Sequence, residues 1–167
     1  MATVNTSDPY KKRQWRGVTL DNRTISAIKW AEKHYLEVAP KKRTKWRIGQ
    51  GSYSNGSMSG GTHTGGGAVD IMFAGLTAKQ RRATTKWLRR AGFAAWSRLD
   101  PKVWGANNAH AHAILRGHRT ASAAAKAQMV AYDNGRDGLV SNLKDTEWRP
   151  KRKRRWSHRQ GKPILGK

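Results

Sequence analysis

Four polar residues of the chain have the types and spacing of a metal site. His63 begins the stretch HTGGGAVD, which ends in Asp70, and the later stretch AHAHAIL contains His110 and His112. A catalytic zinc ion takes three protein ligands with nitrogen or oxygen donors and keeps a further position open for water. The bound ion makes hydroxide available at roughly neutral pH. His63, Asp70 and one of the two later histidines supply such a ligand set.

Each of these residues, taken alone, also has an ordinary structural interpretation. A histidine on a strand is often satisfied by a backbone hydrogen bond, and an aspartate after glycines is often a turn residue. His110 has the further alternative of orienting its neighbours without taking part in chemistry. The combination of the four residues favours the metal site over these interpretations.

The elements that must position these residues follow from hydrophobic periodicity and from helix and turn signals. We expect a buried strand over residues 68–73, with Asp70 within it, and another strand over 109–115. Because side chains alternate along a strand, His110 and His112 point to the same face. A glycine-rich loop over 55–67 precedes the first of these strands. The remaining expected elements are helices over 22–37, ended by Pro40, over 77–91 and over 120–135, and strands over 46–54 and 93–99.

The stretch HTGGGAVD fits the pattern H-x-x-G-x-A-x-D. With the later histidine strand, it resembles the superfamily of lysostaphin, D-Ala-D-Ala metallopeptidases and sonic hedgehog. The similarity is greatest to its D-Ala-D-Ala carboxypeptidase and phage-endolysin branch, and the order of elements agrees over about residues 20–116. The resemblance implies that His63, Asp70 and His112 bind Zn²⁺. It also implies that His110 is catalytic and assists proton transfer or stabilises the tetrahedral intermediate.

The chain departs from this branch at several positions. Ala109 stands where the carboxypeptidases usually have a glutamate base, and Gly61 replaces a serine. No arginine for a terminal substrate carboxylate is evident near QGSYS, which favours an endopeptidase acting on a stem peptide or cross-link. We expect substrate contacts from Gln50, Ser52, Tyr53 and Trp104, of which Trp104 is also a plausible core aromatic residue.

The charge of the chain points to a polyanionic partner. There are 34 Lys and Arg residues against 10 Asp and Glu, a net charge of +24. Such a surface attracts nucleic acid and anionic wall polymers alike. Lys151, Arg152, Lys153, Arg154 and Arg155 form its densest run and are the predicted polyanion-binding residues. The chain has no cysteine, which excludes disulfides and Cys-ligated metal sites.

The sequence thus predicts an α+β fold. A small antiparallel sheet carries the metal site, three helices flank it, and the termini are extended and basic. The expected divisions are a basic arm (1–20), a zinc-peptidase-like domain (21–147) and a basic tail (148–167), which we expect to be disordered alone. The expected function is zinc-dependent hydrolysis of an amide bond in peptidoglycan.

Together with the absence of an apolar signal segment, the resemblance implies a bacteriophage lysin, kept in the host cytoplasm until release to the wall, or a hydrolase carried in the virion with other virion proteins. Two alternatives stay open: a catalytically inactive virion structural or wall-binding module with the same fold, and a basic nucleic-acid-binding protein. A nuclease of the HNH kind is not favoured, because its ββα order is not found.

Overall fold

The computed structural model describes residues 5–38, 43–55 and 60–166 of the chain. Residues 1–4 and 56–59, the predicted helix end at Pro40, and Lys167 lie outside the described residues. The elements are α1 (Asn22–Val38), α2 (Ala78–Ala91), α3 (Pro101–Trp104), α4 (Ala123–Asp133), β1 (Lys12–Trp15), β2 (Val18–Asp21), β3 (Arg47–Gln50), β4 (Ala68–Met72), β5 (Phe93–Arg98), β6 (His110–Leu115), β7 (Arg154–Ser157) and β8 (Lys162–Leu165). This mixed content confirms the predicted α+β class.

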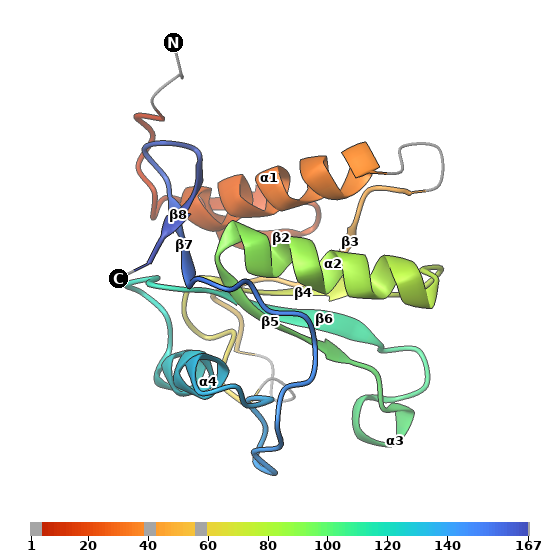
Figure 1. The fold of residues 1–167 in the computed structure, drawn as a ribbon. Coiled ribbons are helices and arrows are strands. Elements are labelled where there is room, and N and C mark those ends of the chain that lie inside the picture. Colours follow the sequence, from red (N-terminus) through yellow and green to blue (C-terminus); the bar gives the residue numbers. More distant parts are fainter. Residues whose placement is uncertain (1–4, 39–42, 56–59, 167) are drawn as a thin grey trace.

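A four-stranded antiparallel sheet forms the centre of the fold, in the order β3-β4-β6-β5. Helices α1 and α2 cover one face of this sheet, and α4 lies on the opposite side (Figure 1). Alternation along β4 divides its side chains between the two faces. Val69 and Ile71 belong to the main core with α1 and α2, while Ala68 belongs to a smaller core with Trp96 and Tyr132. Asp70 therefore faces the α4 side.

Capping residues define the ends of the helices beside the sheet. Thr77 and Gln80 form a capping box at the start of α2, and Gly92 ends this helix in the left-handed conformation, with φ at 101°. Asp21 accepts a hydrogen bond from the backbone N–H of Thr24 at the start of α1. The short turn after α2 leads directly into β5, which lies beside the histidine strand β6.

Both chain ends fold into antiparallel hairpins, so the prediction of a disordered tail was wrong. The strands β1 and β2 pair near the N-terminus, and β7 and β8 pair near the C-terminus (Figure 1). Leu20 and Trp156 are buried in the main core, at 0% and 2% exposure. Burial of a tryptophan in the core fixes the hairpin despite its surrounding charge, because a large apolar area leaves water.

No helix within the described residues is long and apolar enough to cross a membrane.

Candidate metal centre

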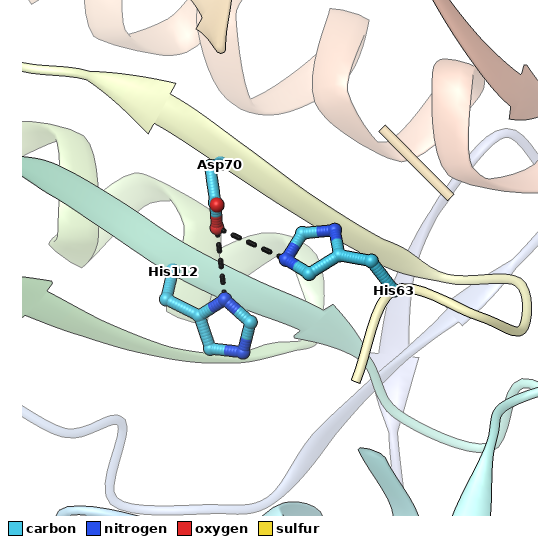
Figure 2. A group of neighbouring side chains, drawn as sticks. All are labelled: His63, Asp70 and His112. Carbon is cyan, nitrogen blue, oxygen red and sulfur yellow. Dashed lines mark hydrogen bonds and ion pairs between the residues drawn. The ribbon is translucent and has the colours of Figure 1, made fainter. Parts of the chain in front are cut away.

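Three side chains from separate parts of the chain converge on the α4 side of the sheet. His63 comes from the loop before β4, Asp70 from β4 and His112 from β6 (Figure 2). One oxygen of Asp70, Oδ1, lies 3.3 Å from His63 Nε2 and 2.8 Å from His112 Nδ1. One potential ligand atom from each residue lies within 4.8 Å of the other two. A tetrahedral ion with bonds of about 2.1 Å would space its ligand atoms roughly 3.4 Å apart. This group can therefore hold a metal ion.

Strand pairing places Asp70 and His112 together. They are direct partners in the antiparallel pairing of β4 with β6, so their side chains leave the same face of the sheet. His110 pairs with Met72 two residues along and lies on that face too. His110 and His112 therefore lie on the same face of the sheet, as their spacing predicts.

The glycine loop brings His63 to the strands by packing closely against the segment after β6. A Cβ atom on Gly66 would lie 2.5 Å from side-chain atoms of His118, Thr120 and Tyr53. Real Cβ atoms essentially never come this near to other heavy atoms, so only glycine fits without movement of its neighbours. The space beside the Gly66 backbone is therefore occupied by the protein itself.

Hydrogen bonds on the far side of each imidazole determine where its lone pair points. His63 Nδ1 donates to the carbonyl oxygen of Gly51 at 2.7 Å, and His112 Nε2 donates to Gln128 Oε1 at 2.9 Å. In a neutral imidazole, the nitrogen that carries no proton is the one that can bind a metal. The nitrogens that face Asp70 are therefore the ones left to bind a metal, and without an ion they can carry the protons that reach its carboxylate. Outer partners of this kind orient histidine ligands in metal sites.

The pKa shifts favour an ionised Asp70 at the centre of the cluster. Burial by itself would raise the pKa of Asp70, but the hydrogen bonds and charges of His112 and His63 outweigh it and hold that pKa below its usual range. Burial lowers the pKa of His112, more than contact with Asp70 raises it. The favoured state is an ionised carboxylate beside a neutral His112, an arrangement that a cation would stabilise.

His110 lies next to the three-residue cluster. Its Nε2 atom is 3.9 Å from Asp70 Oδ2, and its Nδ1 atom donates to the backbone oxygen of Asn108 at 2.6 Å. The ring packs edge-on against Trp104 at 5.4 Å between centroids. Its Nε2 atom is thus directed toward the carboxylate, where it can exchange a proton with a group bound at the cluster.

Of the four residues predicted to contact substrate, two lie near the metal cluster and two have structural hydrogen bonds. Gln50 lines a cleft of about 420 Å³ together with Asp70, and Trp104 contacts His110. Ser52 is buried and donates to the carbonyl oxygen of Ala68 at 2.8 Å. The Tyr53 hydroxyl bonds to Asp21 at 3.1 Å. Gln50 and Trp104 therefore lie near the cluster, while Ser52 and Tyr53 join the glycine loop to the rest of the fold.

The predicted polyanion-binding run borders the C-terminal hairpin. Arg154 and Arg155 begin β7, while Lys151, Arg152 and Lys153 are exposed just before it. Lys153 Nζ lies 3.4 Å from Asp133 Oδ2. These residues are therefore held against the folded domain.

Two contributors to the site were not found from the sequence. Gln128 lies in an alanine-rich helix, and a single amide at that place carries no recognisable signal. Gly51 contributes its backbone carbonyl oxygen, which accepts the hydrogen bond from His63. A glycine is needed there, because a Cβ atom would lie 2.4 Å from the carbonyl oxygen of Thr19. In the sequence, only the glycine in QGS hints that the backbone of residue 51 passes close to another segment.

Comparison with known proteins gives no relative from which the role of the site could be inferred. No family model matches the chain, and searches of curated proteins and of solved structures find no match.

Proposed function

We propose that the protein is a zinc-dependent peptidase that hydrolyses an amide bond in the stem peptide or cross-link of peptidoglycan. The observation that supports this most is the convergence of two imidazole nitrogens and an ionised carboxylate on one point, each imidazole being fixed by a hydrogen bond on its far side. Two histidines and one carboxylate form a donor set found at catalytic zinc sites, where a further position is left for water.

Each residue of the site has a distinct role in this proposal. His63, Asp70 and His112 hold the ion, which when bound supplies a Lewis acid and lowers the pKa of water. His110 receives or returns a proton at Nε2, because Asn108 holds its other nitrogen as a donor. Gln50, which lines the same cleft as Asp70, contacts the peptide in this proposal.

The choice of peptidoglycan rests on the resemblance of HTGGGAVD and the H-x-H strand to the lysostaphin and D-Ala-D-Ala metallopeptidase superfamily. The high positive charge is consistent with retention on an anionic wall. On this proposal the protein is a bacteriophage lysin released to the wall, or a hydrolase carried in the virion.

The deciding experiment combines metal analysis with digestion of purified sacculi. We expect about one equivalent of zinc in the purified protein and new peptide fragments by mass spectrometry. The variant His63→Ala should lose both. His34→Ala is a matched control, because His34 bonds within α1 to the carbonyl oxygen of Trp30, and it should keep both.

Two results would contradict the proposal in different ways. A zinc-loaded protein whose digests match the His63→Ala digests would favour the catalytically inactive wall-binding or virion module. A protein that binds no divalent ion would leave the histidines with a structural role.

A further inference from the structure

A second concave region lies along the free edge of β5, and neither the three cluster residues nor His110 line it. It measures about 820 Å³ and is bounded by α2 and by the segment 144–148. Strand β5 ends the sheet order, so its outer edge pairs with no strand among the described residues. We call this region the β5-edge groove. The proposed peptidase chemistry does not use it.

Cations from α2 form a row along the groove. Lys79, Arg82 and Lys86 follow one another at intervals of three and four residues, so they share one face of the helix. At a rise of about 1.5 Å per residue, they are spaced along the helix axis by roughly 4.5 and 6 Å. None of them forms an ion pair with a described carboxylate.

The acidic residues of the groove are already engaged. Asp145 and Glu147 lie 2.8 and 3.4 Å from the buried guanidinium of Arg89. Asp137 accepts a hydrogen bond from the backbone N–H of Leu139. The three α2 cations therefore remain available to an external anion.

A buried arginine with two unpaired donors also lines the groove. Arg98, the last residue of β5, lines the groove and is 4% exposed. Its Nε and Nη2 atoms have no hydrogen-bond partner in the described structure. These two donors lie on one edge of the planar guanidinium, the edge that binds two oxygens of a phosphate or carboxylate side by side. Burial lowers the pKa of Arg98 to about 10, more than the neighbouring acids raise it.

Trp148, the exposed one of the two tryptophans that line the groove, favours a polymer without bases. Trp148 is 42% exposed, yet Lys86 and Arg90 lie 5.2 and 5.3 Å from the centroid of its ring. Binding of single-stranded nucleic acid relies on open aromatic faces on which bases stack. Here the ring is engaged by cations, so the groove presents charge rather than a stacking surface.

We propose that the β5-edge groove binds a polyol-phosphate polymer of the bacterial wall, with Lys79, Arg82 and Lys86 contacting successive phosphates and Arg98 binding one phosphate through two donors. The assignment to the wall rests on the proposed peptidase function, whereas the affinity for a phosphate polymer rests on the groove itself. The groove thereby holds the domain on its substrate while the metal cluster remains free for the peptide. It replaces the run 151–155 as the principal polyanion site.

The test measures binding of fluorescently labelled polyglycerol phosphate by anisotropy between 50 and 200 mM salt. The groove variant carries Lys79→Gln, Arg82→Gln and Lys86→Gln. Its matched control carries Lys11→Gln, Lys29→Gln and Arg159→Gln, three exposed residues outside the groove and outside the run 151–155, and loses the same charge. Arg98→Lys and Arg98→Gln test the buried receptor, and thermal melting confirms that every variant folds.

We expect at least tenfold weaker binding by the groove variant at 150 mM salt and less than threefold weaker binding by the control. The slope of log affinity against log salt should fall by about 2 in the groove variant, since each lost phosphate contact removes roughly 0.7. Arg98→Lys should lose affinity as Arg98→Gln does, because a lysine cannot offer two donors on one edge.

Equal losses in the groove and control variants would show that net charge alone binds the polymer, and would overturn the proposal. Equally tight, groove-dependent binding of an oligothymidylate with the same number of phosphates would overturn the assignment to a wall polymer. Hydrolysis of a soluble stem peptide separates this proposal from the previous one: the groove variant should retain it. Wild-type protein that binds the polymer but neither zinc nor peptide would refute only the peptidase.

Discussion

Removal of the amide of Gln128 tests whether an outer hydrogen bond prepares His112 to bind metal. In Gln128→Leu, the side chain keeps a similar size but loses the oxygen that accepts from His112 Nε2 at 2.9 Å. The proton of His112 is then no longer held on that nitrogen, and the nitrogen facing Asp70 spends less time as a free lone pair. We expect weaker zinc binding with the three ligands unchanged.

The size of the effect follows from the burial of the histidine. Loss of an outer partner of a histidine ligand lowers metal affinity by about 10- to 100-fold, which corresponds to roughly 1.4 to 2.7 kcal/mol. Because His112 is only 7% exposed, water does not fully replace the lost acceptor. The metal-free variant should therefore also be less stable, by about 1–3 kcal/mol.

Competition with a zinc-binding dye measures the affinity, and urea denaturation in the presence of a chelator measures the stability. Gln160→Leu is the matched control, because Gln160 is exposed in the turn between β7 and β8. Gln128→Glu should bind zinc at least as tightly as the wild type, since a carboxylate also accepts from His112. Unchanged affinity in Gln128→Leu, beside complete loss in His112→Ala, would refute the positioning role.

The central sheet and the helices could largely be predicted from the sequence, because the residue patterns that indicate them are local. The helix predicted over 77–91 spans Ala78–Ala91, and the strand predicted over 109–115 spans His110–Leu115. Capping by Thr77 and termination at Gly92 are read directly from residue types. A short apolar run over 68–73 placed Asp70 on a strand, and a period of two along 109–115 placed the two histidines on one face of another strand.

The strand order and the outer hydrogen-bond partners of the candidate ligands could not be predicted in this way. The sequence does not say that Asp70 lies opposite His112, since that pairing depends on which strands become neighbours. Gln128 meets His112 only because α4 packs across this face, 16 residues further along the chain. Contacts that join separate elements depend on packing, and a single residue type does not reveal them.

The structure of the charged C-terminal end was not predicted either, because it too depends on a contact between distant parts of the chain. A run such as KRKRR is typical of disordered tails, but Trp156 follows it at once and enters the main core. One large buried side chain outweighs the composition of its neighbours, because the long stems of lysine and arginine can remain at the surface with their charges in water. The predicted boundary at residue 148 therefore separates residues that fold together.

Two further predictions concern stability. Trp156→Ala should destabilise the protein by about 3–5 kcal/mol in urea denaturation, because it removes a core side chain that is 2% exposed; a change below about 1 kcal/mol would show that the hairpin is dispensable. Asp21 lies 2.9 Å from His118, with both side chains fully buried. Burial would raise the pKa of Asp21, but His118 and Thr24 together lower it below its ordinary value of 3.8. The ionised carboxylate therefore stabilises the fold above pH 3.8, and this contribution is lost as the pH falls through the lower folded-state pKa. Asp21→Asn should cost about 3 kcal/mol at pH 7, because it leaves His118 without its charged partner. The gap between wild type and variant should narrow in urea denaturation below pH 3.8; a gap that stays constant down to pH 2 would mean that the charge of Asp21 contributes nothing.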